Sequence, residues 1–284
     1  MLDHRSETFL TLYDEMNYRR TAEKLNMTQP GVTQHIQYLE RYYGVKLFAY
    51  DGRTLRRTEN AEQLKRYLDS LRTEELALRQ SFLKSDVVSL RLGATKTIGE
   101  FVIVPQIKKF LANRHHALSL VVDNTAVLLS LLERAELDFA VIEGVFDKEK
   151  YGSHLFKKEN FVGICAADHP FAGRVVSLEE LFGAHLIVRE KGSGTRRLLE
   201  QAVEERGYTL ERFRRCSSIS NFSVICAVVA QGDAVTFAYE PIVHSRTDLA
   251  TFAVADMQIR GEFNYVYCSE RVGREKIKQF LGEE

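Results

Sequence analysis

The sequence lacks several features that would place it at once in a functional class. The formal net charge of its 284 residues is zero, so any argument for a polyanionic partner must be local. No apolar run reaches the roughly 18–20 residues that a membrane helix needs. No signal peptide opens the chain either, because Met1–Arg5 leads straight into an amphipathic pattern. We therefore expect a cytoplasmic protein with no membrane partner.

Cysteine is scarce, and its spacing argues against two kinds of site. The chain has four cysteines, none of them in a CxxC pair: Cys165, Cys216, Cys226 and Cys268. Widely spaced thiols favour a reducing compartment, in which we expect them to be free and buried. His115 and His116 have no acidic or cysteine partner at metal-ligand spacing. The sequence therefore predicts no metal site and no cofactor.

What the sequence does contain is enough chain for two or three domains, together with a local basic segment. Apolar residues make up 45% of it and charged residues 27%, as in an ordinary soluble globular protein. Between Arg41 and Thr58 five basic residues accompany one acidic residue, Asp51. A local excess of positive charge is the electrostatic footprint of a nucleic-acid contact, and here it is modest.

The N-terminal segment carries the strongest pattern. Apolar residues at helical spacing predict one helix over Phe9–Met16 and a second over Tyr18–Leu25. Thr28 is predicted to be the N-cap of a third helix, because its side chain can accept a hydrogen bond from a free backbone N–H, and Gly44 ends that helix. Two short helices joined by a tight turn, the second opening with polar side chains, are typical of a helix-turn-helix.

The third helix has an apolar side and a polar side. Val32, Ile36 and Leu39 make the apolar side, which anchors the helix. His35 is predicted to lie on the polar side. A helix that enters the major groove by its N-terminal end needs hydrogen-bonding side chains there, since Gln can pair with adenine and Thr can contact the thymine methyl group. The candidate DNA-binding residues of this helix are Thr28, Gln29, Pro30, Thr33, Gln34 and Gln37.

A short basic hairpin is predicted after the third helix. In "VKLFAYDGRTLRRTE", Asp51-Gly52 marks a tight turn between two extended runs. Arg53 at the tip is predicted to enter a minor groove, while Arg56 and Arg57 are predicted to meet phosphates. The alternative is a basic hairpin that faces only solvent.

The segment from Phe9 to Ala61 resembles the winged helix-turn-helix of LysR-type transcriptional regulators. The resemblance rests on these positions: Ala22, Leu25, Gln29-Pro30, Val32, Leu39-Glu40, Gly44-Val45, Leu47-Phe48 and Thr58. The sequence departs from the family pattern at Thr21, where the family usually has alanine, and at Asn60-Ala61, where it usually has Ala-Gly. The resemblance implies a sequence-specific regulator that binds double-stranded DNA, and that also contacts RNA polymerase if it activates transcription.

A long helix is predicted from Asn60 to about Lys84, because this stretch has no Gly or Pro. A heptad-like apolar seam runs along it: Leu64, Leu68, Leu71, Leu78 and Phe82, with Glu75 at the skipped position. Such a narrow stripe favours a partner helix, and the alternative is that it packs on its own chain. The resemblance implies that two such helices pair antiparallel in a dimer and that dimers assemble into a tetramer. Ser85-Asp86-Val87 is the predicted hinge.

From Ser89 onward, strands and helices alternate. The runs "LRLGA", "LSLVVDN" and "DFAVIEG" are predicted strands, separated by helices over Glu100–Ala112 and Ala126–Ala135. This order implies a parallel sheet covered by helices. A second set of predicted strands follows: "NFVGICAA", "HLIVRE", "FRRCSSI" and "AVTFAYE". Helices are predicted between them over Leu178–Phe182, Thr195–Arg206 and Asn221–Gln231, and a last strand, "FNYVYCSE", is followed by a helix over Gly273–Leu281. Two α/β lobes with chain crossings between them resemble the periplasmic-binding-protein-like effector domain of the LysR family.

We therefore expect an α/β multidomain chain. Its predicted limits are 1–59 for the winged helix-turn-helix, 60–87 for the linker helix and hinge, and 88–284 for the effector-binding domain. Lobe I is predicted over 88–160 and 264–284, and lobe II over 161–263.

Ligands in such folds lie between the lobes, at the carboxyl ends of strands where helices begin. The candidate effector-binding residues follow predicted strands: Thr95, Lys96, Thr97, Asn124, Ser193, Gly194, Thr195, Ser220, Asn221 and Phe222. Hydroxyls and free N–H groups at helix N-termini favour an anion, so we expect a small carboxylate or inorganic oxyanion as effector. The alternative is that several of these residues only cap helices.

Two other classes of protein fit the sequence less well. An enzyme would need a catalytic constellation, but "GSGT" matches neither the Walker pattern nor GxGxxG, and Ser193 has no His-and-acid pattern near it in the sequence. A solute-binding protein of a transporter would not be expected to carry a helix-turn-helix. We expect no catalytic residues.

Overall fold

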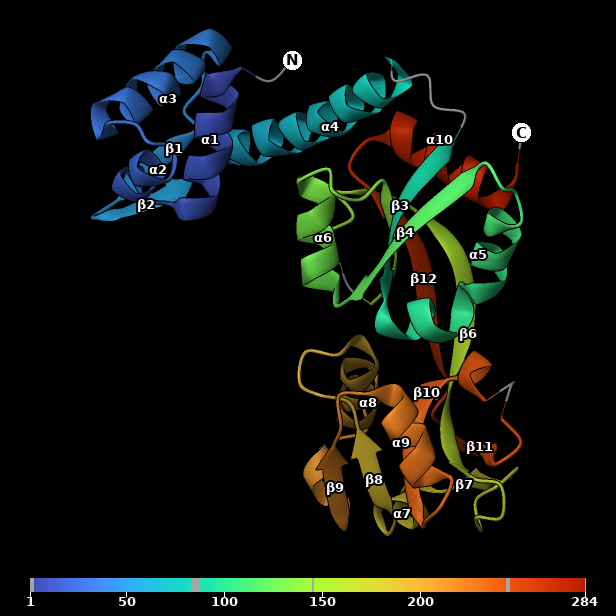
Figure 1. Cartoon of the computed structure of the whole chain (residues 1–284). Helices are drawn as coiled ribbons and strands as arrows, with labels where there is room; N and C mark the ends of the chain where they lie inside the picture. Colours follow the sequence, from blue (N-terminus) through green and yellow to red (C-terminus); the bar gives the residue numbers. More distant parts are fainter. Residues whose placement is uncertain (1–2, 83–86, 145, 244–245, 284) are drawn as a thin grey trace.

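The computed structural model describes residues 3–82, 87–144, 146–243 and 246–283. Figure 1 shows three parts: a small helical domain at the N-terminus, a long helix that leads away from it, and two α/β lobes stacked one above the other. We call them the upper lobe, which lies next to the long helix, and the lower lobe. No helix in the described ranges is long and apolar enough to cross a membrane.

The N-terminal domain has the predicted helix-turn-helix and hairpin. Its elements are α1 (His4–Glu15), α2 (Tyr18–Lys24), α3 (Gln29–Tyr43), β1 (Phe48–Asp51) and β2 (Thr54–Arg57). The Thr28 hydroxyl accepts the Gly31 N–H at 3.2 Å, and Gly44 closes α3 with φ of 69°, a conformation that favours glycine. Phe9, Val32 and Ile36 lie in its core. The local signals in the sequence were therefore sufficient to predict the helices and the hairpin of this domain.

The long helix α4 (Glu59–Phe82) does not carry one continuous seam. Leu64 and Leu68 are buried in the core of the N-terminal domain, whereas 53% of Leu78 and 71% of Phe82 are exposed. The prediction of a single partner-facing stripe is thus wrong for the first half, which packs on its own chain. The departure from the family pattern after Thr58 has no effect on the helix start, because the Thr58 hydroxyl accepts the Ala61 N–H at 3.2 Å.

The first two residues of the predicted hinge, Ser85 and Asp86, cannot be compared with the structure, since they lie outside the described residues. The cysteines can be compared. All four thiols are free, and Cys165 and Cys226 are buried as expected. The prediction is wrong for Cys216, which is exposed because it lies on β9 at an edge of the sheet.

The upper lobe is built on a sheet whose first three strands are parallel, as predicted. Its elements are β3 (Val88–Thr95), η1 (Ile98–Val102), α5 (Val104–Leu111), β4 (His116–Asp123), α6 (Thr125–Glu133), β5 (Phe139–Glu143) and α10 (Glu270–Leu281). The helix expected over Glu100–Ala112 is divided into a π-helical turn, η1, and α5. Pro105 explains the division, because it has no N–H to continue the helical ladder through this point.

The lower lobe has a smaller sheet of mixed direction, with helices against it. Its elements are β7 (Val175–Val176), α7 (Leu178–Phe182), β8 (His185–Val188), α8 (Gly194–Glu204), η2 (Leu210–Arg212), β9 (Arg215–Ser218), α9 (Phe222–Val229), β10 (Ala234–Tyr239), η3 (Glu240–Ile242) and β11 (Leu249–Val254). The sequence patterns indicated most of these elements but missed β7 and β11.

Two long antiparallel strands join the lobes, and Figure 1 shows both running from one lobe into the other. They are β6 (Gly152–Ala166) and β12 (Ile259–Tyr267). In the upper lobe β12 lies between β5 and β6, and in the lower lobe β6 pairs with β10 and β11. The sequence indicated only the second half of β6, because its first half is polar and partly exposed and does not show an apolar run.

Candidate nucleic-acid interface and ligand pocket

The polar side of α3 faces outward. Gln29, Gln34 and Gln37 are exposed, and within the described ranges their side-chain amides make no hydrogen bond. Thr28 and Pro30 are exposed beside them. Thr33 is half-buried, and its hydroxyl donates to the Gln29 carbonyl at 3.1 Å. A ridge of unpaired amides at the start of a helix has the chemistry that base edges in the major groove require.

His35 does not belong to this polar ridge, and its predicted place is wrong. Its Nδ1 lies 2.9 Å from the Thr8 hydroxyl, and its ring packs edge-on against His4 with 4.9 Å between centroids. Burial, together with the charges of His4 and Arg5, lowers the pKa of His35. The side chain therefore holds α3 against α1.

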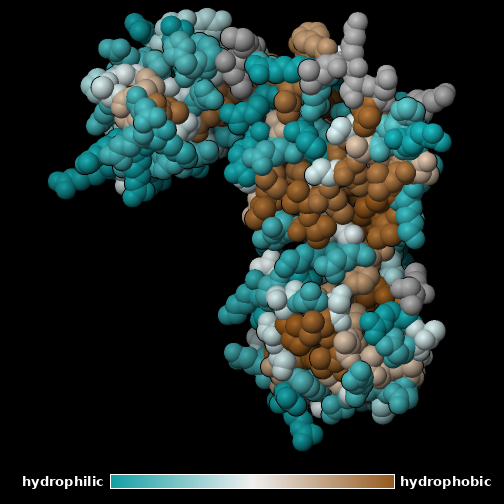
Figure 2. All heavy atoms as spheres, in the orientation of Figure 1, coloured by the Kyte–Doolittle hydropathy of each residue, from teal (hydrophilic) through white to brown (hydrophobic). Residues whose placement is uncertain are grey.

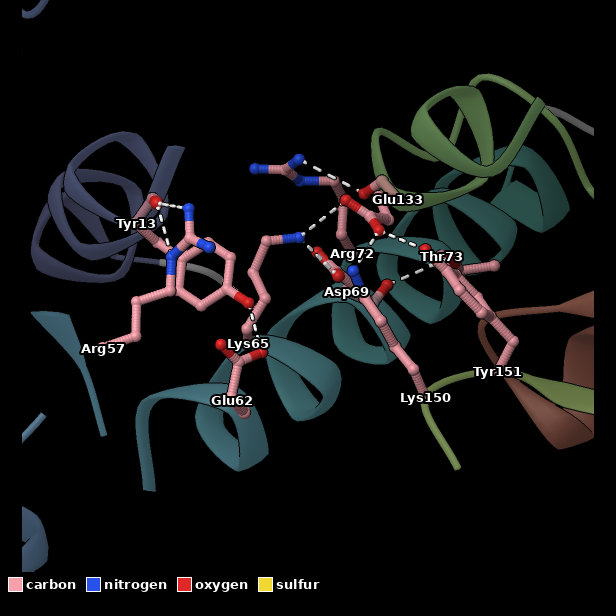
Figure 3. Close-up of polar contacts among 10 residues, drawn as sticks. All are labelled: Tyr13, Arg57, Glu62, Lys65, Asp69, Arg72, Thr73, Glu133, Lys150 and Tyr151. Atoms are coloured by element: carbon pink, nitrogen blue, oxygen red, sulfur yellow. Dashed lines mark hydrogen bonds and ion pairs between the residues drawn. The ribbon is translucent and has the colours of Figure 1, made fainter. Parts of the chain in front are cut away.

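The three arginines of the basic hairpin have different surroundings. Arg53, at the tip, is exposed and makes no ion pair with the described residues. Arg56 is exposed and bridges to Asp51 at 2.6 Å within the hairpin. Arg57 departs from the prediction: its Nη2 donates to the Tyr13 carbonyl at 2.6 Å, and its guanidinium lies 4.1 Å from the centre of the Tyr13 ring. Figure 3 shows this contact, which fastens the hairpin to α1.

A pocket between the lobes has the polar lining of a ligand site. Another pocket, of about 390 Å³, lies between the N-terminal domain and α4, but its lining is mainly apolar. The pocket between the lobes measures about 370 Å³ and lies at the carboxyl ends of β3, β4, β5 and β8. Five predicted residues line it: Thr95, Lys96, Asn124, Ser193 and Gly194. We call it the interlobe pocket. Its volume suits a small molecule.

Five predicted residues do not line the interlobe pocket. Thr97 and Thr195 are buried, and the Thr195 hydroxyl lies 2.8 Å from that of Ser193. Ser220 is exposed elsewhere on the lower lobe. Asn221 caps α9 by accepting the Val224 N–H at 3.0 Å, and Phe222 packs on the ring of Phe101. For Asn221, the alternative that it only caps a helix describes what is observed.

An ion-pair bridge crosses the interlobe pocket. Lys96 of the upper lobe approaches Glu190 of the lower lobe at 3.3 Å, and Arg189 donates to the same carboxylate at 2.8 and 3.1 Å. Burial raises the pKa of Glu190, but the hydrogen bonds from Arg189 and Lys96 outweigh it and leave the pKa below its usual value. The Glu190 carboxylate thus occupies a position between two cations, which is the place that a bound anion would take.

A second acid lines the same pocket. Glu143, at the end of β5, is buried, and its Oε2 has no hydrogen-bond partner within the described part of the chain. Burial raises its pKa to about 7. Glu143, Arg189 and Glu190 were missed in the sequence, although each ends or directly follows a predicted strand. The rule that sites form at the carboxyl ends of strands was sufficient to find them.

The raised pKa of Glu143 predicts a pH dependence of stability. Between about pH 4.5 and pH 7 the folded protein holds a proton on Glu143 that the unfolded chain has lost, so stability from this group is lost as pH rises. The free energy of unfolding, measured in urea, should fall by about 3 kcal/mol more in the wild type than in Glu143→Gln over this range. Glu211→Gln, at an exposed position, should follow the wild type. Parallel curves for wild type and Glu143→Gln would contradict the assignment.

A buried ionic cluster joins α4 to the upper lobe, and Figure 3 shows it. Lys65, almost fully buried on α4, reaches Asp69 at 2.6 Å and Glu133 of α6 at 3.1 Å. Glu133 also receives Lys150 at 2.6 Å and the hydroxyl of Tyr151. We call these five residues the junction cluster. Glu133 ends α6, whereas residues at the other end of this helix line the interlobe pocket. One short helix therefore connects the pocket to the helix that carries the N-terminal domain.

Comparisons with known proteins agree with this architecture. Residues 86–283 match the family model of the LysR substrate binding domain, and residues 4–62 match that of the bacterial regulatory helix-turn-helix protein, lysR family. The RuBisCO operon transcriptional regulator of Allochromatium vinosum is 32% identical over 202 residues, which are 68% of this chain and 66% of that protein. The regulator CysL of Bacillus subtilis is 26% identical over 211 residues, 71% of this chain and 69% of CysL. Both are named as transcriptional regulators and not as enzymes.

Solved structures share the fold. A full-length OxyR from Pseudomonas aeruginosa superposes with a TM-score of 0.62 at 20% identity, covering 99% of this chain and 94% of OxyR. The CcmR regulatory domain of Synechocystis PCC6803, solved in complex with 2-PG, gives 0.57 at 19% identity over 68% of this chain and 96% of that domain. Full-length CbnR in complex with its target DNA gives 0.57 at 15% identity over 99% and 98%. With both family models matched in order along one two-lobed fold, the chain belongs to the LysR family of transcriptional regulators.

Proposed function

We propose that this protein reads duplex DNA with the polar ridge of α3 and the tip of the hairpin, and that a small effector in the interlobe pocket changes its grip on DNA. The observation that carries the first half is the set of exposed, unpaired amides of Gln29, Gln34 and Gln37. Arg53, at the tip of the hairpin, adds a positive charge that is exposed and makes no ion pair with the described part of the chain. We retain Arg56 as a proposed phosphate contact, whereas Arg57 fastens the hairpin to α1 through Tyr13.

The second half of the proposal is that the effector carries an anionic group. Lys96 and Arg189 already hold the carboxylate of Glu190, so an effector anion can take its place without creating a new charge in the pocket. Ser193 and Gly194 begin α8, whose N-terminus also favours negative charge. A structural neighbour, the CcmR regulatory domain, was solved in complex with 2-PG, which supports a small anionic effector.

Displacement of Glu190 would break a bridge between the lobes and so change how they sit on each other. An effector can act only through unequal affinity for two arrangements of the protein. The proposal therefore requires that the effector bind the rearranged lobes more tightly, and that the junction cluster carry the rearrangement to α4.

Self-association belongs to the same proposal. Leu78 and Phe82 are exposed along α4 and fit a partner helix of a second copy. Figure 2 shows further hydrophobic side chains over β4 in the upper lobe and over α9 in the lower lobe, where Val224 and Val228 are exposed. We propose a dimer through α4 and a tetramer through the lobes, in the cytoplasm, with RNA polymerase as a further partner if the protein activates transcription. We also propose the domain limits 1–59, 60–87 and 88–284.

The test is a gel-shift titration on a promoter fragment with a dyad repeat, combined with thermal melting against carboxylates, sulfate, phosphate and amino acids. We expect a salt-sensitive shift, since phosphate contacts release counterions, and a raised melting temperature with at least one anionic compound that also changes the shift. A protein that ignores DNA under all salt conditions would contradict the first half. A melting temperature unmoved by every compound would contradict the second.

A further inference from the structure

The charges in the interlobe pocket are not balanced by the ion-pair bridge. Lys96 and Arg189 share one carboxylate, that of Glu190, and the third cation that lines the pocket, Lys191, is exposed and makes no ion pair with the described residues. Two other acids, Asp123 and Glu143, also line the pocket. Asp123 accepts the Asn124 N–H at 2.7 Å and has no ion-pair partner in the described ranges. Among the charged pocket groups that make no ion pair with the described residues, the buried one is therefore an acid, Glu143.

Glu143 is the more informative of the two acids, because it is buried and one of its carboxylate oxygens lacks a hydrogen bond within the described residues. Only 6% of the residue is exposed, and its Oε2 makes no hydrogen bond to the described residues. The Thr97 hydroxyl and the charge of Arg189 favour its ionised form, but neither pairs with it. A buried acceptor that loses water and gains no partner costs free energy, so such groups in folded proteins usually mark a place where something else binds.

The position of Glu143 explains how a ligand would reach it. It belongs to the upper lobe, and Gly194 of the lower lobe lies against it: a Cβ placed on Gly194 would be 3.8 Å from Glu143 Cγ and 3.9 Å from Oε1. Separation of the lobes would open this contact to solvent, and closure around a ligand would bury the ligand group that faces Glu143. A cation or a strong donor there would supply the partner that the acid lacks.

We propose that the effector carries an ammonium group as well as its anionic group, and that Glu143, assisted by Asp123, binds the ammonium. The ligand class is then an amino-acid-type zwitterion, with its carboxylate toward Lys96 and the start of α8 and its ammonium toward β5. This inference rests on the proposed function of the interlobe pocket. It narrows that function, since inorganic oxyanions and simple carboxylates fill only one half of the site.

The experiment uses the full-length protein and sets of acids that differ only at the second carbon. One set is succinate, malate and aspartate; others are glutarate, 2-hydroxyglutarate and glutamate, and propionate, lactate and alanine. Further natural amino acids are each compared with the matching deaminated acid. Dissociation constants are measured by calorimetry. In at least one set we expect the amino compound to bind about tenfold or more tightly than the unsubstituted acid, with the hydroxy acid between them.

Two variants connect the preference to the pocket. In Glu143→Gln the advantage of the amino compound should fall to about threefold or less, because a neutral amide attracts an ammonium weakly. Asp123→Asn should reduce it by a smaller factor and serves as a second measurement if Glu143→Gln folds poorly. Glu211→Gln, at an exposed position of the lower lobe, should keep the full advantage.

The outcomes separate this inference from the function on which it rests. If sulfate, phosphate or simple carboxylates bind and amino compounds do not bind better, the zwitterion is wrong and the anionic effector stands. Equal binding of hydroxy and amino acids, or an amino preference that survives in Glu143→Gln, also overturns it. If no compound binds and DNA binding never responds, the effector half of the proposed function fails as well.

Discussion

Replacing Gln29 by alanine is expected to weaken binding to the cognate operator by about 1–3 kcal/mol, while binding to unrelated duplexes changes little. Gln29 is the first residue of α3, and its amide is exposed and unpaired in the described structure, so it is free to make two hydrogen bonds to one adenine. The substitution removes these hydrogen bonds only at DNA sites that present the adenine, so only cognate binding is weakened. Fluorescence anisotropy with cognate and scrambled duplexes measures the difference.

Two controls sharpen this result. Gln231→Ala makes the same change at an exposed position of the lower lobe and should leave both affinities unchanged. Arg53→Ala should weaken binding to both duplexes alike and reduce the slope of affinity against salt by about one unit, because a phosphate contact carries little sequence information. If Gln29→Ala binds the operator as the wild type does, α3 does not read bases through this residue.

Replacing Lys65 by methionine is expected to destabilise the protein by about 3–5 kcal/mol and to uncouple the effector from DNA. The Lys65 side chain is 4% exposed, and its ammonium is the nearest cation to the buried carboxylate of Asp69. Without it Asp69 keeps no cation at contact distance, whereas Glu133 still has Lys150. Burial already raises the pKa of Asp69 to about 6 against the effect of Lys65, which shows how poorly this site hydrates a charge.

Chemical denaturation measures the loss of stability, and Lys24→Met is its control. Lys24 also forms an ion pair, with Glu15 at 2.8 Å, but it lies on the surface, so the same substitution should change the stability little. In the double variant Lys65→Met, Asp69→Leu the stability should recover in part, since the buried carboxylate is removed together with its partner. A similar loss in Lys24→Met and Lys65→Met would show that burial of the cluster is not what matters.

The functional readout of Lys65→Met is the change in DNA affinity caused by the effector. The effector should still bind, because the interlobe pocket lies at the opposite end of α6. Its effect on DNA affinity should approach a factor of one, since coupling requires both sites to favour the same arrangement. Full coupling in a folded Lys65→Met protein would mean that the signal travels by another route.

The sequence predicted the N-terminal domain well because its signals are local. Thr28 and Gly44 act within one helical turn, and neither needs a distant partner. His35 and Arg57 could not be placed in this way, since their partners Thr8 and Tyr13 lie far away along the chain. Their polar side chains gave the same pattern as groove-facing residues.

The interlobe pocket shows the same limit on a larger scale. Lys96 was predicted from its place after a strand, but its partner Glu190 comes from the other lobe. Lys65 was hidden among the polar residues of a long helix, and only the fold brings it to Glu133. The domain limits and the site residues remain predictions, which the experiments above address.

The path of the last long strand has a consequence for biosynthesis. In the upper lobe β12 lies between β5 and β6, and it leaves the ribosome after every strand of the lower lobe. The lower lobe is encoded later than most of the upper lobe, but its own strands β7 to β11 are all synthesised before β12. The sheet of the upper lobe therefore lacks the strand between β5 and β6 until β12 has been synthesised. During that interval a chaperone would meet a nascent chain whose N-terminal reading head is complete but whose regulatory half is not, so DNA binding can precede control.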